Sequence, residues 1–580
     1  MYRNIYLLFL FLFVAFACQK EALDLKPTDQ IAEERVWSDP NLTSAYLTGL
    51  YSIAPIHYVA ADPASDNWLA ICREMDDINT SDEGYINWIN PYGKDYSKGT
   101  LDNTGGFNEY WDYAAIRKFN EFILKVPLIS DDVNYPAEKT AKWVAEARFL
   151  RAYAYFHLVK RYGGVPLVTE PQDITLPLET LQLPRSKEED IYNFIISELT
   201  EIAPDLPPVA SDYGRATKYA ALALKSRAAL FAGSIAQFGT VELDGVVGIP
   251  ADKAATFYQE AYDASLDIIT NGGFDLYNKY ADKALNFQSI FFDERNIETI
   301  FAKQRTGPGG VIENYEFFQI PQIYHAWGGG QESGVQAGMI EAFENVDGSP
   351  TALPDIGTSL FTRSELFANK DPRFKASVFT CGTYWIKDTL LSYLGVITED
   401  GSINNDANYK GLLTRGTSNQ GSTFGVLKNL DPGWIASWAH QGKLDWIDFR
   451  LGEMYLNLAE AAFELGKTAE ALDAVNKIRT RAGVPLLGEI TRDAIRHERQ
   501  VELAFEGHRY WDCRRWRIAV DVFSNDNRYA IIRRDFLTLK YRVDVLPFTT
   551  PNLFLSKNYY FPITPARIGS NPKLVENPGY

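Results

Sequence analysis

The sequence contains few of the residues that metal, disulfide and nucleic-acid chemistry require. Its 580 residues include 4 cysteines and 6 histidines, and none has a Cys or His neighbour at the spacing of metal ligands. Lys and Arg number 57 against 75 Asp and Glu, which gives a net charge of -18 without any basic cluster. We therefore expect no metal site, no disulfide framework and no nucleic-acid partner, because phosphate binding depends on a density of Lys and Arg that is absent.

A hydrophobic run long enough to cross a bilayer is also missing. The main apolar stretch begins at Tyr6 and ends at Ala17, and a membrane-spanning helix needs about 20 such residues. Arg3 precedes the stretch, and the small residues Ala15 and Ala17 lie at its end. This is the pattern of a secretory signal peptide, so we predict that residues 1–17 are removed on export.

A cysteine, Cys18, follows this stretch directly, and the polar segment QKEALDLKPTDQ comes next. The order resembles a bacterial lipoprotein signal, whose cysteine is acylated and becomes the new N-terminus. The polar segment also resembles the lysine-plus-acid signals that send some Gram-negative lipoproteins to the outer face of the outer membrane. We predict a lipidated Cys18 with a tether over residues 18–30, and membrane attachment through the acyl chains. An ordinary signal with an incidental cysteine and an uncleaved anchor are the alternatives.

Three cysteines remain if Cys18 is acylated, namely Cys72, Cys381 and Cys513. They are odd in number and far apart in the sequence. Buried free thiols are therefore expected, with a single disulfide as the alternative.

Helical periodicity is clearest in residues 450–485. Leu451, Leu458 and Ala462 fall on one helix face, and after a turn at Gly466 a second apolar stripe runs to Gly483. This pattern is typical of a tetratricopeptide-like helix pair. Similar stripes predict two more pairs, 143–166 with 189–207 and 215–236 with 254–270. We expect a mostly α fold with about three to four such pairs.

Long irregular segments separate the predicted helices. Residues 79–108, 307–362 and 400–443 are rich in Gly, Asn and Tyr. Loops of this length in a compact protein are usually functional or disordered, and the aromatic content argues against disorder. These segments are therefore expected to carry the function, together with the tryptophans in or beside them, which are Trp68, Trp88, Trp327, Trp385, Trp434 and Trp438.

Fragments that suggest catalysis fail when their full motifs are tested. The GKT at Gly466 lacks the preceding glycine of a phosphate-binding loop, and the pair His497-Glu498 lacks the second histidine of a zinc protease. The segment from Asp77 lacks the glycine and glutamate of a calcium loop. Paired carboxylates such as Asp445 with Asp448 leave a surface glycoside hydrolase open as an alternative. No cofactor is expected.

A dense run of charge lies in ERQVELAFEGHRYWDCRRW, which begins at Glu498. Glu498, Glu502 and Glu506 recur at every fourth residue, as on one face of a helix. Arginines are in reach along the sequence, namely Arg499, Arg509, Arg514 and Arg515. We interpret the segment as a buried ion-pair network that fastens the last helix to the repeats, and not as a catalytic site.

Several segments together resemble the SusD/RagB family. They are the run from Glu498, the helix pair LGEMYLNLAEAAFELGKTAEALDAVNKIRTRAGVP, the earlier EARFLRAYAYFHLVKRYGGVPL, the DPRF at Asp371 and the ending YFPITPARIGSNPKLVENPGY. They occur in order from the lipoprotein cysteine to the C-terminus. The resemblance implies a SusD-like fold in a non-enzymatic lipoprotein on the outer leaflet of the outer membrane, facing the cell exterior. It also implies glycan capture and delivery to a SusC-like TonB-dependent transporter.

Two further expectations follow from the resemblance. Residues 31–300 should form the N-terminal region with helical repeats and residues 301–580 the C-terminal region, within one compact unit. Since some relatives serve peptide uptake, a peptide-binding lipoprotein that uses the concave repeat face is the main alternative, and a surface hydrolase is the less favoured one.

A glycan site should combine flat aromatic rings with hydrogen-bonding side chains, because a sugar ring has an apolar C–H face and a rim of hydroxyls. Tryptophans in helix-like segments, Trp37, Trp111, Trp143, Trp511 and Trp516, are expected in the core. Three loop tryptophans have polar or aromatic neighbours that suit a sugar. The predicted ligand-binding residues are Asn67, Trp68, Asp82, Tyr85, Asn87, Trp88, Tyr324, Trp327, Gln331 and Trp434. For each tryptophan a core position is the alternative.

Overall fold

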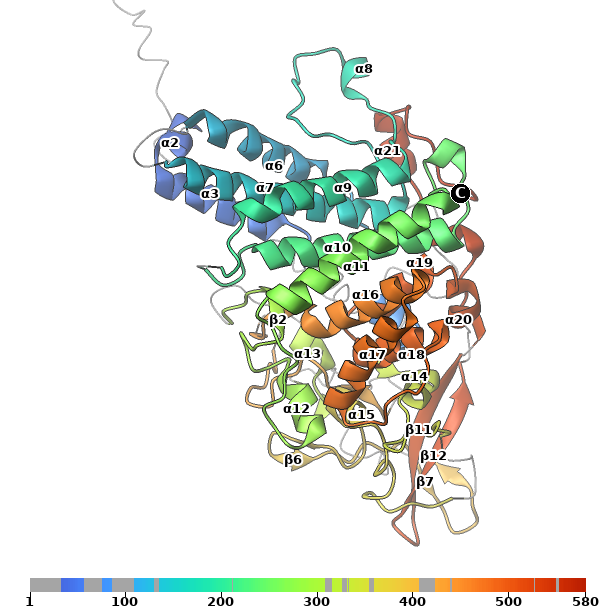
Figure 1. The fold of residues 1–580 in the computed structure, drawn as a ribbon. Coiled ribbons are helices and arrows are strands. Elements are labelled where there is room, and N and C mark those ends of the chain that lie inside the picture. Colours follow the sequence, from blue (N-terminus) through green and yellow to red (C-terminus); the bar gives the residue numbers. More distant parts are fainter. Residues whose placement is uncertain are drawn as a thin grey trace, which may run out of the picture.

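A computed structural model of the chain describes residues 33–56, 76–85, 109–129, 135–210, 212–307, 315–325, 331, 333–353, 359–405, 423–438, 441–525, 527–548 and 552–580 (Figure 1). The mostly helical fold that the sequence predicts is confirmed. The helices are α2 (Glu33–Ser38), α3 (Pro40–Ile53), α5 (Asp76–Asn79), α6 (Tyr113–Lys125), α7 (Ala137–Tyr162), α8 (Leu178–Leu181), α9 (Glu188–Ile202), α10 (Lys218–Phe238), α11 (Ala254–Asn271), α12 (Lys283–Ser289), α13 (Tyr315–Gln319), α14 (Ala337–Ala342), α15 (Pro372–Ser377), α16 (Leu451–Glu464), α17 (Thr468–Ala482), α18 (Arg492–Glu502), α19 (Arg509–Arg515), α20 (Ala519–Asn525) and α21 (Pro565–Ser570). None of these helices is long and apolar enough to cross a membrane.

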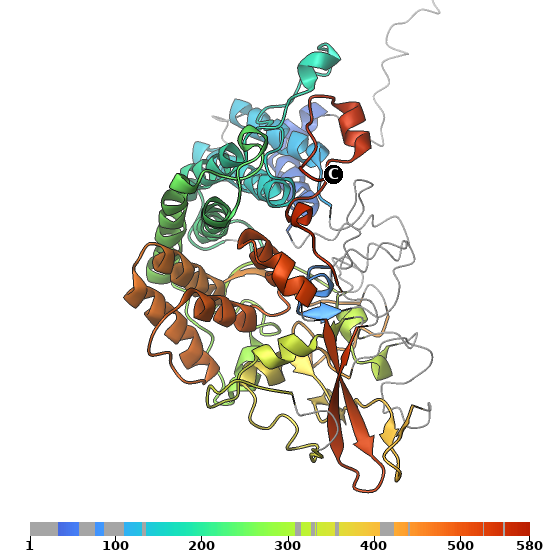
Figure 2. The ribbon, with the colours of Figure 1, turned by 90° about the vertical axis from the view of Figure 1, so that its right-hand side faces the viewer.

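The predicted helix pairs form as antiparallel neighbours. α7 packs on α9, α10 on α11, and α16 on α17. The ends of these helices follow ordinary capping chemistry: the Thr217 hydroxyl accepts from the Ala220 amide at the start of α10, and Gly483 takes the left-handed conformation (φ +76°) that ends α17. Figure 2 shows the pairs following one another in an arc along one side of the molecule.

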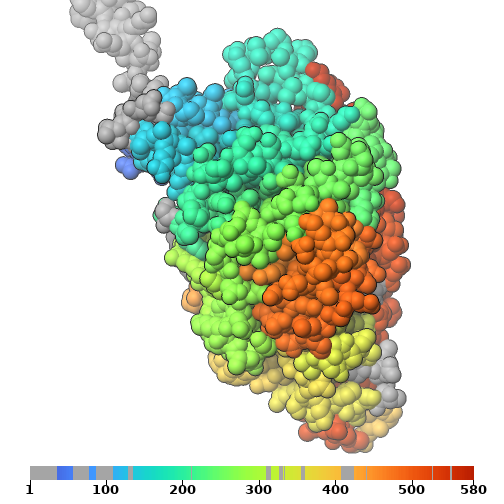
Figure 3. Space-filling model, in the orientation of Figure 1, coloured from blue at the N-terminus to red at the C-terminus, as the bar shows by residue number. Residues whose placement is uncertain are grey.

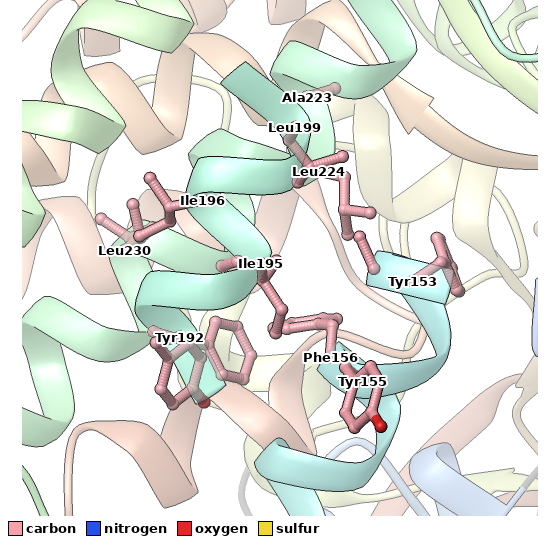
Figure 4. Packing of buried hydrophobic residues seen from close by; sticks show 14 of the residues in the cluster. Tyr153, Tyr155, Phe156, Tyr192, Ile195, Ile196, Leu199, Ala223, Leu224 and Leu230 are labelled. Carbon is pink, nitrogen blue, oxygen red and sulfur yellow. The ribbon is translucent and has the colours of Figure 1, made fainter. Parts of the chain in front are cut away.

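The helical core fills the space between these pairs. In Figure 4 apolar side chains of α7, α9 and α10 meet in this core, among them Phe156, Ile195 and Leu224. α7 and α10 are buried around most of their circumference, because other helices cover both of their sides. The orange helices α16 to α18 continue the packing below the green α11 in Figure 3.

A second core lies among the short strands and loops. Strands β1 (Gly84–Tyr85), β3 (Gly334–Val335), β9 (Gly425–Val426) and β4 (Val378–Phe379) form one small sheet in that order. Another sheet has the order β12 (Tyr541–Pro547), β11 (Arg528–Asp535), β7 (Val396–Ile397) and β8 (Ile403–Asn404). The remaining pairs are β10 (Trp446–Arg450) with β2 (Thr299–Lys303), and β5 (Tyr384–Trp385) with β6 (Asp388–Thr389). This core supports the segments that carry the predicted ligand-binding residues.

Candidate ligand-binding site

Half of the predicted ligand-binding residues fall in the part of the chain that the structure describes. These are Asp82, Tyr85, Tyr324, Gln331 and Trp434. The others lie outside the described residues, namely Asn67, Trp68, Asn87, Trp88 and Trp327. The predicted lipidation site Cys18 and the cysteine Cys72 also lie outside them. Cys381 and Cys513 are buried free thiols, as predicted.

The small sheet β1-β3-β9-β4 brings together the three irregular segments that the sequence marks as functional. Tyr85, the last residue of β1, pairs with Gly334, the first residue of β3. Gly334 pairs in turn with Gly425, the first residue of β9. Directly paired residues in neighbouring strands lie about 5 Å apart. The segments 79–108, 307–362 and 400–443 are therefore anchored side by side on one sheet.

Gln331 belongs to the same anchor. Its side chain is 1% exposed, and its backbone amide donates to the Ile320 carbonyl at 3.0 Å. A Cβ added at Gly425 would lie 2.2 Å from the Phe379 Cζ atom and 2.8 Å from the Gln331 Cγ atom, so glycine is needed where these two side chains meet β9. Gln331 thus packs against β9, and a ligand would meet it only at the base of a site.

The β1 segment is fixed to the C-terminal helices by charge. Both Asp82 carboxylate oxygens accept from Arg509 in α19 at 2.8 Å, so a ligand bound to Asp82 would compete with this ion pair. The Glu83 side chain, fully buried, accepts from the Phe505 amide at 2.9 Å. Burial raises the pKa of Glu83 to about 8. The hydrogen bond from Phe505 lowers this pKa, but its effect is smaller than that of burial.

Aromatic rings surround the end of β1. The Tyr85 ring is 5% exposed and lies 4.9 Å from the Phe548 ring and 5.8 Å from the Tyr529 ring, centroid to centroid. Such packed rings form a rigid apolar support. Tyr85 thus supports the segment that leads to Asn87 and Trp88 in the sequence, and its ring has little area left for a ligand.

Tyr324 has a more open position. Its hydroxyl donates to an Asp388 carboxylate oxygen at 2.6 Å, and its ring meets Trp385 edge-on at 5.1 Å. Burial, then the hydrogen bond to Asp388 and the charge of Asp388, raise the pKa of Tyr324. Trp385 is 2% exposed and therefore belongs to the core, whereas Tyr384 beside it is 68% exposed. The β5-β6 hairpin and Tyr324 together offer ring, hydroxyl and carboxylate groups.

Trp434 lies in a loop that is fixed by several hydrogen bonds. Its indole N–H donates to the Gln441 carbonyl at 2.9 Å, and the Lys443 ammonium lies 5.4 Å from its ring centroid. Trp434 is half-buried, while Trp438 in the same loop is 52% exposed. The sequence places both residues in one irregular segment, and only the packing of the loop distinguishes them. Trp438 is thus a candidate contact that sequence reasoning did not select.

The tryptophans expected in the core mostly lie there. Trp143, Trp511 and Trp516 are buried, and Trp37 and Trp111 are half-buried against the helical core. Among the tryptophans that the structure describes, Trp438 has the largest exposed fraction.

The charged segment from Glu498 forms a buried ion-pair network, as predicted, but with other partners. Glu498 pairs with Arg373 at 2.6 Å and Arg479 at 2.8 Å. Glu502 contacts Arg373 at 3.1 Å and Arg450 at 2.7 Å, and it also pairs with Arg481. Glu506, which lies beyond the end of α18 and not on the helix, pairs with Arg450 at 2.7 Å and Lys428 at 2.8 Å.

The arginines near these acids in the sequence have different roles. Arg499 pairs with Asp512, Arg515 with Glu460 and Asp512, and Arg509 with Asp82. Arg514 donates to the backbone carbonyls of Asn558 and Tyr559 at 2.6 Å. The predicted partners are wrong because helix geometry points these side chains to other elements. The actual arginine partners come from α15, β10 and α17, and Lys428 comes from the loop after β9.

Comparison with known proteins gives a consistent result over most of the chain. A family model described as the SusD family matches residues 297–580, and one described as starch-binding associating with outer membrane matches residues 25–230. SusD-like protein P25 of Formosa agariphila is 24% identical, and the match covers 99% of this chain and 98% of that protein. The crystal structure of a SusD-like protein from Bacteroides fragilis has a TM-score of 0.74 at 25% identity and covers 96% of this chain and all of that chain. A SusD-like carbohydrate binding protein from the same species has a TM-score of 0.70 at 24% identity, with 93% of this chain and 99% of that chain covered.

Proposed function

Since this chain belongs to the SusD family, we propose that it captures oligosaccharides at the cell surface and delivers them to a SusC-like TonB-dependent transporter. Members of the family are binding proteins without catalytic activity, which sets aside the glycoside hydrolase alternative. The proposed site is built by the irregular segments 79–108, 307–362 and 400–443, together with Trp68, which precedes the first of them in the sequence.

One observation carries this proposal: Tyr85, Gly334 and Gly425 pair side by side on the small sheet. Each of these residues belongs to a different irregular segment. In the sequence, Trp88 follows Tyr85 by three residues and Trp327 follows His325 by two. A site with two or more stacking rings requires the segments that carry these rings to be anchored close together. The small sheet provides this common anchor.

The chemistry of the segments suits a sugar. An exposed ring that stacks on a sugar removes roughly 40 to 60 Å² of apolar area from water, which gives about 1 to 1.5 kcal/mol per ring. Two or three rings with hydrogen bonds to hydroxyls correspond to dissociation constants of about millimolar to tens of micromolar. Weak binding of this order suits a protein that must release its cargo to a pore. The description of one matching family as starch-binding, and of a related structure as carbohydrate binding, support the same class of ligand.

The peptide-binding alternative places the ligand on the concave face of the helical repeats. In the described part of the chain α10 is buried around most of its circumference, and residues from α16 and α19 pack against it. The α10 part of the repeats is thus covered by other helices of the protein, which favours the loops over the repeats as the binding site.

We place the protein on the outer leaflet of the outer membrane through acyl chains on Cys18. The description of the matching N-terminal family as associating with the outer membrane supports this position. Several acyl chains give stable anchoring, because each buried CH₂ contributes about 0.8 kcal/mol.

The test combines a glycan array with alanine variants of soluble protein that begins after Cys18. Trp68→Ala, Trp88→Ala and Trp327→Ala should each weaken binding of the best array glycan by about 1 to 3 kcal/mol in calorimetry, with little change in melting temperature. Trp143→Ala is the matched control, since this ring is 7% exposed in the helical core. It should cost about 3 to 5 kcal/mol of folding stability and leave affinity unchanged. Three loop variants that are destabilised and bind as the wild type does would overturn the assignment.

A further inference from the structure

One cavity among the described residues lies beside the loop of Trp434. Its volume is about 800 Å³, and it is open to solvent. Three stretches of chain line it: residues 277–297 after α11, residues 305–306 after β2, and residues 431–444, the loop of Trp434. Ligand pockets in proteins typically measure about 300–1,000 Å³, so this cavity can hold several sugar units.

Charged side chains in the cavity pair with one another. The Lys279 ammonium contacts an Asp293 carboxylate oxygen at 2.8 Å, and the Lys443 ammonium contacts Asp431 at 3.1 Å. The Tyr277 hydroxyl also donates to Asp293. With Arg305 and Glu294 the lining holds equal numbers of cations and carboxylates, so the charges sum to zero. The lining itself therefore presents no excess charge of either sign to a ligand.

Each of these ion pairs suits a polyol. A Lys–Asp pair presents a donor and an acceptor side by side, and a sugar hydroxyl both donates and accepts. Lys279 and Lys443 keep about half of their side-chain area exposed (57% and 42%), so their ammonium groups are accessible from the cavity. The two pairs come from different stretches of chain, which allows one ligand to contact both.

The lining also offers apolar area. Phe292 is half-buried and Ile297 is 51% exposed, and both line the cavity. A partly exposed ring beside hydrogen-bonding groups matches the apolar face and polar rim of a sugar. A peptide or lipid would gain more from a continuous apolar groove, which this charged lining does not provide.

The cavity walls are held in place before any ligand binds. The Asn296 amide donates to the carbonyls of Ile290 at 2.8 Å and Asp293 at 3.0 Å. On the other stretch the Glu316 carboxylate, 2% exposed, accepts from the Lys443 amide at 2.8 Å and the Asp431 amide at 3.2 Å. A preformed site reduces the conformational entropy that binding must overcome.

We infer that this cavity is a second oligosaccharide site, specific for neutral glycans. Its described lining shares the segment 400–443 with the site on the small sheet and otherwise comes from residues 277–306. The inference rests on the proposed function for its ligand class. A second site would let a long glycan bind at two points, which raises the effective affinity.

The test uses the neutral hexasaccharides maltohexaose, cellohexaose and laminarihexaose, with hexagalacturonate as the charged comparison. Lys279→Met with Lys443→Met removes both ammonium groups at exposed positions, so the fold should be kept. Lys253→Met is the matched control, since Lys253 is similarly exposed (44%) and does not line the cavity. Binding is measured by saturation-transfer NMR and calorimetry in the wild type and in the Trp68→Ala, Trp88→Ala, Trp327→Ala triple variant.

We expect the triple variant to keep residual binding of a neutral hexasaccharide, and the added lysine changes to weaken it by about tenfold or more. Lys253→Met should leave it unchanged. Two results would overturn the second site and leave the proposed function intact. In the first, the lysine changes do not affect the residual binding. In the second, the triple variant binds no neutral hexasaccharide while the wild type does. A wild type that binds neither the neutral hexasaccharides nor hexagalacturonate overturns both. Binding of hexagalacturonate alone overturns the neutral second site and leaves the proposed function intact.

Discussion

Replacement of Glu502 by Ala tests the buried network that holds the C-terminal helices together. Glu502 is fully buried, and its carboxylate contacts Arg450, Arg373 and Arg481. Burial opposes the ionisation of this carboxyl, but the three guanidinium groups outweigh that effect and hold its pKa well below the usual range. Without this carboxylate, the three buried guanidinium groups would have fewer carboxylate oxygens to pair with.

The expected loss of stability follows from that arrangement. Removal of one partner of a buried ion pair costs about 3–5 kcal/mol, because the remaining charge stays in the interior without compensation. The entropy of unfolding is about 2.1 cal/mol/K per residue, so for 580 residues that unfold together it is about 1.2 kcal/mol/K. The melting temperature should therefore fall by about 2.5–4 °C.

Scanning calorimetry of the soluble protein at pH 7 measures this shift. Glu489→Ala is the matched control, since Glu489 is exposed in the same region of the chain and should leave the melting temperature unchanged. The pKa of Glu502 is depressed on folding, so its contribution is present above the unfolded pKa of about 4.3 and is lost as the pH falls below it. The difference between wild type and Glu502→Ala should accordingly shrink in acid. Equal melting temperatures at pH 7 would show that the carboxylate adds nothing to stability, and an equal fall for Glu489→Ala would show that burial is not the cause.

Three further predictions address other buried or terminal groups. Folding raises the pKa of Glu83 to about 8 through burial, so the folded state holds this proton more tightly, and stability should fall as pH rises from the unfolded pKa to about 8. Glu83→Gln should be more stable than the wild type at pH 8 by up to about 5 kcal/mol and should lose this pH dependence. Urea unfolding at pH 5 and pH 8 measures both effects, and a Glu83→Gln variant that is less stable than the wild type at pH 8 would contradict the prediction. Burial raises the pKa of the Cys381 thiol to about 11 and raises that of the Cys513 thiol further. Iodoacetamide should therefore label both thiols only after denaturation. Mass spectrometry that finds either thiol labelled in the native protein would contradict their burial. Cys18→Ala should abolish palmitate incorporation and surface anchoring while the melting temperature stays unchanged, and palmitate labelling of this variant would refute the lipoprotein assignment.

Helix pairing illustrates what local sequence can predict. The stripe at Leu451, Leu458 and Ala462 and the turn at Gly466 give α16 and α17 nearly to the residue. These features depend on contacts three or four residues apart and on a single backbone conformation at Gly483. A helical pattern of this kind can be recognised within a short stretch of sequence, so its prediction needs no tertiary information.

Partner choice illustrates the opposite case. The burial of Glu502 is predicted from its place in a charged, regularly spaced segment, but its partners Arg373, Arg450 and Arg481 come from three separate elements. Sequence distance favours Arg499, which instead pairs with Asp512. Such pairs depend on the direction of each side chain on its helix and on which distant segments of the chain pack beside it. The sequence pattern shows neither.

The sequence by itself determined that this is a mostly helical member of the SusD family with long aromatic segments, because repeat and family motifs are local and occur in order along the chain. Only the tertiary structure decided that Tyr85, Gly334 and Gly425 share one sheet, that Trp438 is exposed while Trp434 is half-buried, and that Lys279 and Lys443 line one cavity. Each of these facts joins residues far apart in the chain or depends on how a loop packs. Such contacts form only when the whole core is assembled, since hydrophobic burial and not local propensity selects them.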